Sequence, residues 1–311
     1  MKNWVFLGPN LISGIGQVTK HYSEAVKGDH YIYGDKLPQE PTMYDVGFVF
    51  LLPLISNLLE ADKIARICKK MIYMTVCETE TVDESYKMLE NYQPLYVPAE
   101  FCQNVLNTQF PKLNCKILRH YVSIPPPIEP KKNSPYIFYT IGNVADPRKN
   151  IQNLIQAFQA CNFPDAQLLI KATCNRPVHI AAPNITMINQ YLTTEQIQKI
   201  HKSCHCYVNC SHSEGVGMGA VEAALNNKPV IITNYGGLQE YVKTPFIINA
   251  PKGKIGFDDF LFKRDMVWGH PQFDDIVKCL KECYERRLTH WDHEHTRELI
   301  TQIPNNLNNI E

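Results

Sequence analysis

Two glutamates, Glu214 and Glu222, stand at either end of a glycine-rich segment that follows a short apolar run and opens a helical pattern. A carboxylate in a loop beside the N–H groups of a helix start can bind sugar hydroxyls. A carboxylate on the helix can accept both hydroxyls of a ribose, because it offers two acceptor oxygens. Gly215 and Gly217 let the backbone come close to such a ligand. We therefore expect this segment to bind a sugar or a nucleotide.

Two adjacent cations, Arg148 and Lys149, follow a strand expected at 136–141 and precede a helix that starts at Ile151. A guanidinium can hold two phosphate oxygens at once and an ammonium acts as a point charge, so this pair suits a diphosphate. The alternative is a solvated basic pair at a helix start. Because the helix dipole disfavours cations there by about 0.3–1 kcal/mol, we favour the phosphate site.

A glycine loop lies near the N-terminus, where Gly14 and Gly16 follow the first expected strand and open a helix. Such a loop can offer backbone N–H groups to a phosphate. A dinucleotide-binding fingerprint needs a third glycine, but this chain has Thr19 in that place; Asp35 lies near the distance expected for a ribose contact. From this loop alone, a plain tight turn and a weakened NAD site both stay open.

Cysteines and histidines cluster at 204–212 without the distant second pair of ligands that is usual in a zinc site. Cys206 and Cys210 lie in an apolar run, where cysteine behaves as a small hydrophobe, so we expect structural thiols there. The eleven cysteines are an odd number, and a chain of 311 residues can build a core without disulfides, which indicates reduced thiols. We expect the histidines of 290–295 to lie on a solvated C-terminal segment.

Short apolar runs alternate with helical periods along the chain, which is typical of α/β folds with parallel sheets. Five prolines between residues 123 and 135 cannot lie in a helix or a central strand and indicate a stiff linker. Strands are expected at 3–8, 30–33, 45–50, 71–76, 94–98, 116–119, 136–141, 167–171, 185–189, 206–209, 229–233 and 246–249. Helices are expected at 15–26, 54–69, 83–91, 99–109, 151–158, 194–203, 218–227 and 273–288.

These elements predict an α/β protein with two doubly wound, Rossmann-like domains, at residues 1–128 and 136–285, joined by a proline-rich linker at 129–135. Residues 286–311 would form a C-terminal segment that packs back on the N-terminal domain. In open α/β sheets ligands bind outside the carboxyl ends of the strands. We therefore expect the loops of both domains to face one cleft.

The composition excludes several classes of protein. Apolar residues make up 44% and charged residues 20%, which is ordinary for globular domains and excludes disorder and coiled coil. Lysine plus arginine is 31 and aspartate plus glutamate is 31, whereas nucleic acids and anionic membranes favour a basic excess, so we expect neither partner. No run reaches the roughly 18 apolar residues of a transmembrane helix. We expect a cytoplasmic protein.

Taken together, these motifs resemble the retaining GT-B glycosyltransferases of family 4, the glycosyl transferases group 1. The similarity is carried by Glu214 and Glu222 with Gly215-x-Gly217 between them, and by Lys149 before an amphipathic helix. The other matching segments are Lys228-Pro229 with its apolar run, Gly236-Gly237-x-x-Glu240, the N-terminal glycine loop and Tyr96 to Phe101. The resemblance spans most of the chain and implies a GT-B fold.

The resemblance implies an enzyme that moves a hexose from a GDP- or UDP-sugar to the hydroxyl of an acceptor such as a glycan, with retention of configuration. It implies that Glu214 is the catalytic residue at the donor sugar and that Glu222 binds the ribose. The remaining donor-binding residues that it implies are Gly14, Gly16, Arg148, Lys149, Gly215, Val216, Gly217 and Met218. No Asp-x-Asp motif follows a strand, so we expect neither a metal nor another cofactor.

Three departures from the family pattern leave alternatives open. Asn143 stands where arginine is usual, with Arg148 as the candidate substitute; Cys77-Glu78 stands where a histidine is usual; and the N-terminal domain is short. A catalytically silent sugar-nucleotide-binding or scaffold protein and a GT-B nucleotide-sugar epimerase are the alternatives. The stretch Cys77-Glu78-Thr79 resembles Trp-Glu-Thr of some mannosyltransferase-like members, which favours GDP over UDP.

Overall fold

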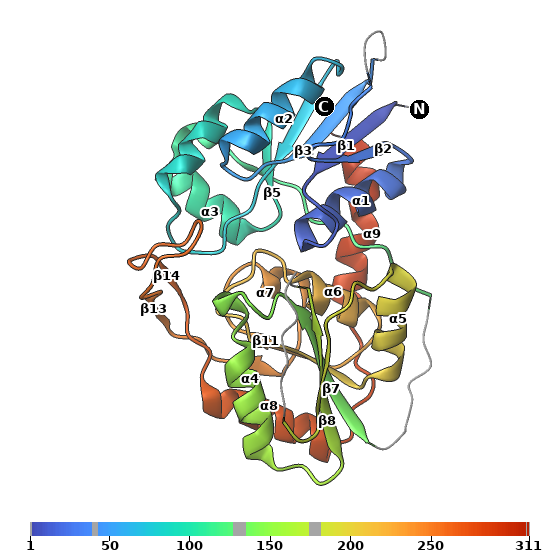
Figure 1. The fold of residues 1–311 in the computed structure, drawn as a ribbon, viewed down its shortest axis with the longest axis vertical. Helices are drawn as coiled ribbons and strands as arrows, with labels where there is room; N and C mark the ends of the chain where they lie inside the picture. Colours follow the sequence, from blue (N-terminus) through green and yellow to red (C-terminus); the bar gives the residue numbers. More distant parts are fainter. Residues whose placement is uncertain (1, 39–42, 127–134, 174–181, 309, 311) are drawn as a thin grey trace. The chain divides into compact units, whose positions relative to one another are not determined.

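The computed structural model describes residues 2–38, 43–126, 135–173, 182–308 and 310 (Figure 1). It divides into two compact units. Unit 1 comprises Met1–Ser123, Lys254–Val267 and Ile300–Glu311, and unit 2 comprises Ile124–Gly253 and Trp268–Leu299. Apart from Pro135, the expected linker at 129–135 lies outside the described residues. The domain bounds and the shared cleft stay predictions.

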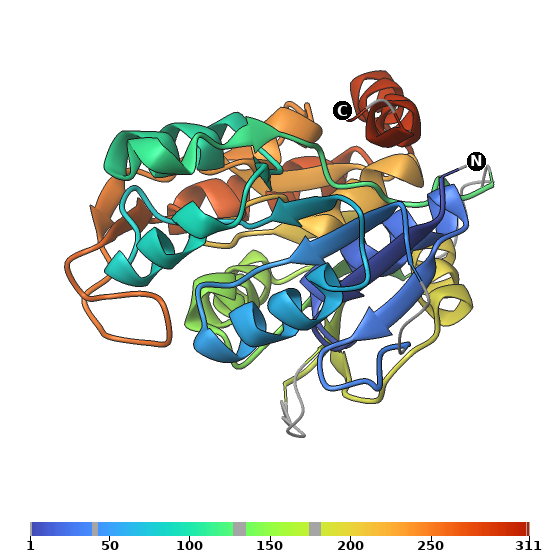
Figure 2. The same ribbon diagram turned by 90° about the horizontal axis from the view of Figure 1, so that it is seen from above.

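Unit 1 is a doubly wound α/β unit. Its elements are β1 (Trp4–Gly8), α1 (Gly14–Val26), β2 (Asp29–Ile32), β3 (Val46–Phe50), α2 (Ile55–Ala65), β4 (Met71–Met74), the 3-10 helix η1 (Glu84–Asn91), β5 (Leu95–Val97), α3 (Glu100–Gln109), the 3-10 helix η2 (Pro111–Leu113) and β6 (Lys116–Ile117). The strands form a parallel sheet in the order β2-β1-β3-β4-β5-β6. Figure 2 shows the blue strands of this sheet with helices along them.

The strands of unit 1 are apolar on both sides because helices cover both faces of the sheet. Val5 and Leu7 of β1 belong to a core that also contains side chains of α2 and α3. Phe6, on the opposite face, contacts Phe48, and Phe48 contacts Tyr22 of α1. Alternate residues of one strand thus bury themselves under different helices, which fixes the register of β1.

Unit 2 repeats this plan. Its elements are β7 (Tyr136–Gly142), the 3-10 helix η3 (Pro147–Lys149), α4 (Ile151–Cys161), β8 (Ala166–Ala172), β9 (Ile185–Ile188), α5 (Thr194–Ser203), β10 (Cys206–Asn209), α6 (Met218–Leu225), β11 (Val230–Thr233), α7 (Leu238–Tyr241), β12 (Ile247–Ile248) and α8 (Phe273–Glu285). The sheet order is β12-β11-β10-β7-β8-β9, with every pairing parallel. Phe138 of β7 belongs to a core with α4 and α8. Tyr139, the next residue, contacts Tyr207 and His201 instead.

The C-terminal part differs from the expectation of a solvated segment. Helix α9 (Glu294–Asn308) follows α8, and Ile300, Ile303 and Leu307 of α9 are buried. His293 is buried as well, with Nε2 2.8 Å from the carbonyl oxygen of Lys228. The prediction of a solvated histidine is therefore wrong for His293, because its ring satisfies a backbone carbonyl of the unit 2 core.

A second difference is a pair of short strands, β13 (Lys252–Lys254) and β14 (Val267–Gly269), that form a sheet of their own. The residues between them, Lys254–Val267, belong to unit 1, although they lie within the range expected for the C-terminal domain. The backbone N–H of Glu80 donates to the carbonyl of Val267 at 3.0 Å, which fixes the end of this segment in unit 1.

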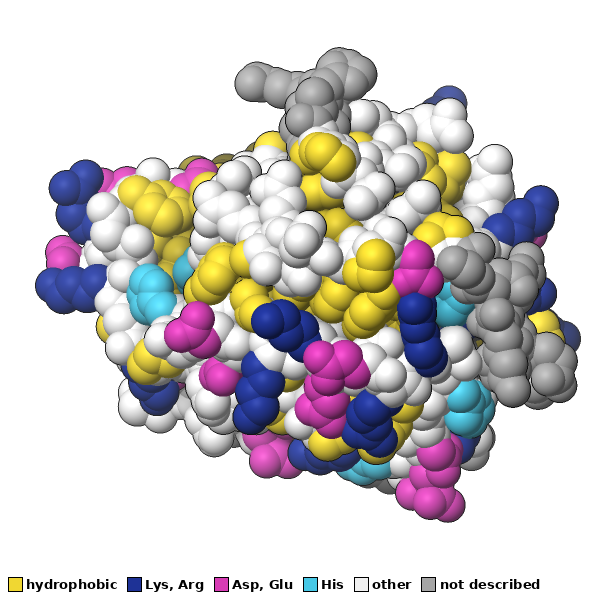
Figure 3. All heavy atoms as spheres, turned by 90° about the horizontal axis from the view of Figure 1, so that it is seen from below, with side chains coloured by type: hydrophobic (Ala, Val, Ile, Leu, Met, Phe, Trp, Pro, Cys, Tyr) yellow, Lys and Arg dark blue, Asp and Glu magenta, His cyan; other side chains and the backbone are white. Residues whose placement is uncertain are grey.

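In the part of the chain that the structure describes, no helix has the length and apolarity needed to cross a membrane. On the face shown in Figure 3, Lys and Arg side chains lie interspersed with Asp and Glu side chains. This mixture agrees with the formal net charge of +0.

Candidate functional site

The two predicted carboxylates and the predicted cation pair all lie in unit 2. Glu214 and the cation pair follow the carboxyl ends of its strands, and Glu222 lies on the helix after the Glu214 loop. Glu214 is in the loop between β10 and α6 and is only 5% exposed. Its Oε1 accepts from Lys149 Nζ at 2.6 Å and from Ser211 Oγ at 2.7 Å, and its Oε2 accepts from Arg148 Nη1 at 3.1 Å. The fold therefore joins two motifs that are 65 residues apart in the sequence.

The electrostatics of this cluster hold Glu214 in its ionised form. Burial by itself raises the pKa of the Glu214 carboxyl, but the Lys149 ammonium and the Arg148 guanidinium outweigh burial and lower this pKa to about 2. At neutral pH the side chain is a carboxylate that can accept hydrogen bonds. It cannot serve as a proton donor there.

Arg148 is bound mainly by the protein itself. It is 9% exposed, and besides Glu214 its Nη1 donates to the carbonyl of Ser213 at 2.8 Å, while Nη2 donates to Asp146 Oδ2 at 3.1 Å. Lys149 is the more accessible cation, because its side chain is 19% exposed against 10% for Arg148. A ligand phosphate would meet Lys149 more easily than Arg148.

A glycine turn after β11 packs against the backbone of Glu214. Gly237 donates its N–H to the Glu214 carbonyl at 2.8 Å. Gly236 has φ +82°, and a Cβ on it would lie 2.5 Å from the same carbonyl oxygen. Only glycine fits this close approach. The Gly236-Gly237 motif thus supports Glu214 through the backbone.

The start of α6 offers a set of backbone donors. Among the described residues, the N–H groups of 215–219 donate to no protein acceptor. Gly217 precedes the helix with φ +73°, and a Cβ on Gly219 would lie 2.3 Å from Tyr207 Oη, so the glycines let this end of α6 approach the sheet. Val216 is buried, and Met218 is half-buried. Unsatisfied N–H groups at a helix start favour an anionic ligand.

Glu222 lies in the second turn of α6, with a side chain 20% exposed. Its Oε2 is 3.6 Å from His201 Nε2. A half-buried carboxylate with remaining acceptor capacity is suited to bind hydroxyl groups.

The glycine loop of unit 1 forms a tight turn that caps α1. The Gly16 N–H donates to Ser13 Oγ at 3.0 Å, and a Cβ on Gly16 would lie 2.3 Å from the Asn10 carbonyl oxygen. Gly14 is exposed. Buried Thr19, in the place of a third glycine, packs against Gly8 of β1, where a Cβ would lie 2.6 Å from Thr19 Oγ1.

Cys77 and Glu78, at the end of β4, differ in their surroundings. The Cys77 thiol is buried in the unit 1 core, 3.8 Å from the Cys102 carbonyl oxygen, and burial raises its pKa well above the ordinary value. Glu78 is half-buried. Of the two, Glu78 is the side chain that a ligand can reach.

The cysteine and histidine cluster of 204–212 is part of the unit 2 core. Cys206 and Cys210 are buried, and burial raises the pKa of Cys210 to about 12. His212 stacks on Trp268, with ring centroids 4.6 Å apart, and its Nδ1 is 2.8 Å from the Gly269 carbonyl oxygen. Trp268 and Gly269 could not be predicted as partners of His212, because neither lies in a motif.

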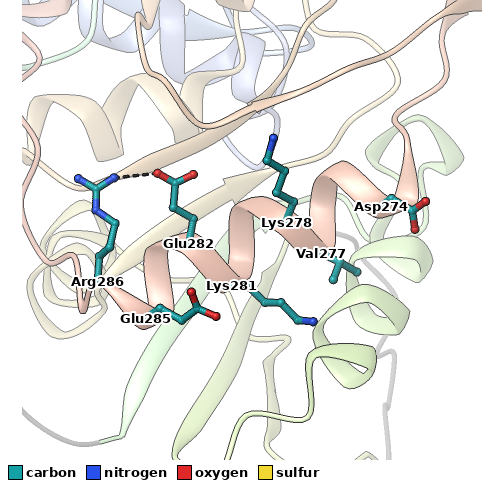
Figure 4. Close-up of a pocket in the computed structure, with 7 residues that line it drawn as sticks. All are labelled: Asp274, Val277, Lys278, Lys281, Glu282, Glu285 and Arg286. Atoms are coloured by element: carbon teal, nitrogen blue, oxygen red, sulfur yellow. Dashed lines mark hydrogen bonds and ion pairs between the residues drawn. The ribbon is translucent and has the colours of Figure 1, made fainter.

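A depression of about 550 Å³ lies on the outer surface of α8 (Figure 4). Charged side chains line it, and two of them, Glu282 and Arg286, form an ion pair at 2.7 Å. None of the residues that the sequence singled out for chemistry lines this depression. We therefore place the candidate site at the Glu214 cluster and the start of α6.

Comparison with known proteins finds one family model and many structures of similar fold. Residues 125–250 match the family described as glycosyl transferases group 1, and none of the curated proteins matches the sequence. The fold is similar to that of a sucrose-phosphate synthase from Thermosynechococcus elongatus, with a TM-score of 0.69 and 13% identity over 99% of this chain and 98% of that chain. It is similar to Anabaena HepE, solved in complex with UDP-glucose, with a TM-score of 0.69 and 12% identity over 100% of both chains.

A further similar structure is an α,α-trehalose-phosphate synthase (UDP-forming) from Burkholderia xenovorans, with a TM-score of 0.63 and 9% identity over 98% of this chain and 96% of that chain. These likenesses confirm the predicted GT-B fold with two Rossmann-like domains.

Proposed function

We propose that this chain, whose residues 125–250 match the family described as glycosyl transferases group 1, transfers a hexose from a nucleotide-diphosphate sugar to an acceptor hydroxyl. The observation that carries the proposal is the position of ionised Glu214 and Lys149 beside the unpaired N–H groups at the start of α6. Together they offer acceptors for sugar hydroxyls and positive charge for a diphosphate.

In the proposed reaction the bond between the sugar C1 and a phosphate oxygen breaks, and a bond between C1 and the acceptor oxygen forms. The departing diphosphate gains negative charge. The N–H groups of 215–219 and the Lys149 ammonium stabilise this charge, and fixed donors of this kind are each worth roughly 10²–10³ in rate. The acceptor proton passes to the leaving phosphate on the same face of the sugar, which retains the anomeric configuration.

In this proposal Glu214 is not a covalent nucleophile, because its carboxylate is held by hydrogen bonds from Lys149, Ser211 and Arg148. The sugar hydroxyl binds to Oε2, which among the described residues accepts from Arg148 alone and keeps an acceptor position. Glu222 accepts the two ribose hydroxyls. The contacts of Arg148 favour a role in holding Glu214 in place over the expected role in phosphate binding. Metal ions are not needed, since Lys149 and the helix start supply the positive charge.

One observation favours a second candidate, a catalytically silent sugar-nucleotide-binding protein. Asn143 stands where the family usually has arginine, and its Oδ1 accepts from the Ala145 N–H at 3.1 Å, so it shapes the turn instead of supplying charge. Arg148, the expected substitute, is largely buried. The cationic charge available to a diphosphate is thus smaller than the family pattern provides.

A hydrolysis and transfer assay with GDP- and UDP-hexoses, in the presence of EDTA, separates the two candidates. We expect release of the nucleoside diphosphate, and proton NMR of the product should show the anomeric configuration of the donor. An inverted product contradicts the mechanism. Tight donor binding with no release in the wild type, even when metal ions are supplied, favours the silent protein.

A further inference from the structure

A buried histidine, His201, lies next to Glu222 and has no part in the reaction proposed above. It is in the last turn of α5, a helix labelled in Figure 1, and is 0% exposed. Its Nδ1 is 2.7 Å from the hydroxyl oxygen of Tyr139, a β7 residue that is also fully buried. Its Nε2 has no hydrogen-bond partner among the described residues, and Glu222 Oε2 is 3.6 Å away. A buried donor without an acceptor is unfavourable, and the Glu222 carboxylate is the acceptor that lies near this nitrogen.

These two contacts favour one tautomer of His201. The Tyr139 hydroxyl can donate to Nδ1 only if Nδ1 carries no proton, and the neutral ring then carries its proton on Nε2. This places an N–H on the side of the Glu222 carboxylate. Tyr207 packs edge-on against Tyr139, with ring centroids 5.0 Å apart, and keeps the tyrosine ring in position.

We propose that His201 is a positioning residue, which holds the Glu222 carboxylate in the orientation that binds the two hydroxyls of a ribose, and that Tyr139 orients His201. The inference rests on the proposed function, because it takes Glu222 as the ribose-binding group. A separation of 3.6 Å is longer than a hydrogen bond. The Glu222 side chain is 20% exposed, and we expect it to rotate toward His201 when it binds the ribose. A carboxylate has about four acceptor positions, so one bond from His201 leaves room for both ribose hydroxyls.

The competing role is packing, in which His201 only fills space between α5, α6 and the sheet. Calorimetry on the full chain with UDP and GDP, each compared with its 2′,3′-dideoxy form, separates the roles. The readout is the ratio of the dissociation constants of the dideoxy and the ordinary nucleotide. A loss of packing weakens both ligands alike, whereas a disoriented Glu222 weakens only the ligand with ribose hydroxyls.

We expect His201→Phe to reduce this ratio by roughly tenfold, the size of one hydrogen bond to a charged group. His201→Gln, which keeps an N–H donor, should restore most of the ratio, and Tyr139→Phe should give an intermediate value. The double variant His201→Phe/Glu222→Ala should match Glu222→Ala alone, because both act on one contact. The matched control is the variant His205→Phe. His205 is another buried histidine of unit 2, and its Nδ1 accepts from the Ile137 N–H, so its replacement should leave the ratio unchanged.

An unchanged ratio in His201→Phe, or an equal loss for both nucleotides, overturns the positioning role. If His201→Phe does not fold, Tyr139→Phe decides, because it removes only one hydroxyl: a wild-type ratio contradicts the proposal. A wild type that binds neither UDP nor GDP refutes the proposed function itself. If the wild type binds UDP or GDP normally and the ratio is unaltered in the variants, only the role of His201 is refuted.

Discussion

Glu214 concentrates several interactions in a place with little access to water. Two cations and a serine hydroxyl donate to its carboxylate, and Asn209 Nδ2 lies 3.3 Å from Oε1. Removing one partner of a buried ion pair leaves an uncompensated charge, which typically costs 3–5 kcal/mol. Glu214 is therefore both a candidate catalytic residue and a residue on which the stability of unit 2 depends.

The variant Glu214→Gln should separate these two contributions. It keeps the size of the side chain but removes the charge that neutralises Arg148 and Lys149, so we expect Tm to fall by roughly 10 °C. We expect kcat to fall on the order of 10²–10³-fold at temperatures where the variant is folded. Thermal melts and steady-state rates measure both effects, with the exposed Glu285→Gln as control. A variant with wild-type Tm contradicts the buried ion cluster.

The pH dependence of stability follows from the same residue. Because the pKa of Glu214 in the folded protein is lowered to about 2, its ionised form stabilises the fold above the ordinary pKa of a glutamate, and this contribution disappears as the pH falls toward 2. The difference in unfolding free energy between wild type and Glu214→Gln should be constant above about pH 5 and shrink below about pH 4. Urea titrations at several pH values test this. A difference that grows on acidification contradicts the lowered pKa.

Arg148 and Lys149 should respond differently to alanine. Arg148→Ala leaves Asp146, Glu214 and the Ser213 carbonyl without their buried donor, so we expect loss of stability of about 3–5 kcal/mol. Lys149→Ala removes the more accessible cation, and we expect the larger fall in kcat from this variant at a temperature where both are folded. Denaturant titrations and rates on the two variants measure this. Equal wild-type rates would mean that the turn has no part in catalysis.

Single residues of the site were predictable where a motif carried them. Glu214, Glu222 and Lys149 stand in recognisable patterns, and the structure places Glu214 and Lys149 in contact. The burial of Arg148 could not be predicted, because two of its partners, Ser213 and Glu214, are 65 and 66 residues away in the sequence. His201 was missed for a related reason: one histidine on a helix gives no signal until the fold brings it next to α6.

At the scale of elements, the glycines of the β10–α6 segment set how closely the helix approaches the sheet. A Cβ on Gly219 would lie 2.3 Å from Tyr207 Oη and 3.1 Å from Tyr207 Cζ, so either the tyrosine or the start of α6 has to move. If the start of α6 moves, the unpaired N–H groups of 215–219 move with the helix. The glycines therefore set the position of these N–H groups.

Gly219→Ala should destabilise the protein by about 1–3 kcal/mol through overpacking and should weaken the binding of nucleoside diphosphates. Tyr207→Phe in the same chain removes the hydroxyl and should restore part of both losses. Melts and calorimetry with UDP and GDP measure the effect. Gly142→Ala serves as a stability control, since its Cβ would make only ordinary contacts at 3.7 Å. Unchanged nucleotide affinity in Gly219→Ala would contradict the placement of the phosphate site at the start of α6.

Most strands and helices were predictable because burial under helices gives parallel strands continuous apolar runs. The expected segment 83–91 is a 3-10 helix, η1, rather than an α-helix. Strand β13 was missed because Lys252-Gly-Lys254 is polar and too short to show alternation. Its partner β14, which is equally short, was missed with it. Helix α9 contains Pro304, a residue that ordinarily ends a helix, although the spacing of Ile300, Ile303 and Leu307 indicates an apolar face.

At the scale of the whole molecule, the chain consists of two doubly wound units with different loops at the carboxyl ends of their strands. In unit 2 these loops carry cations, carboxylates and unpaired N–H groups. In unit 1 the glycine loop caps α1, and Thr19 fills the space that a third glycine would leave between helix and strand. The chemistry of a nucleoside diphosphate therefore fits unit 2, whereas unit 1 departs from the dinucleotide pattern.

A thermal-shift panel of GDP, UDP, ADP and NAD tests this division on the intact protein. A ligand that binds only the folded state adds about 2.7 kcal/mol at a hundredfold excess over its dissociation constant. Each kcal/mol raises Tm by roughly 2–4 °C for a domain of 150–250 residues, so the correct nucleotide should stand out by several degrees. We expect GDP or UDP to give this shift and Glu222→Ala to reduce it. NAD should give none, because Thr19 stands where a dinucleotide fingerprint has its third glycine. A shift with NAD and none with a nucleoside diphosphate would contradict the glycosyltransferase proposal and favour a dinucleotide site in unit 1.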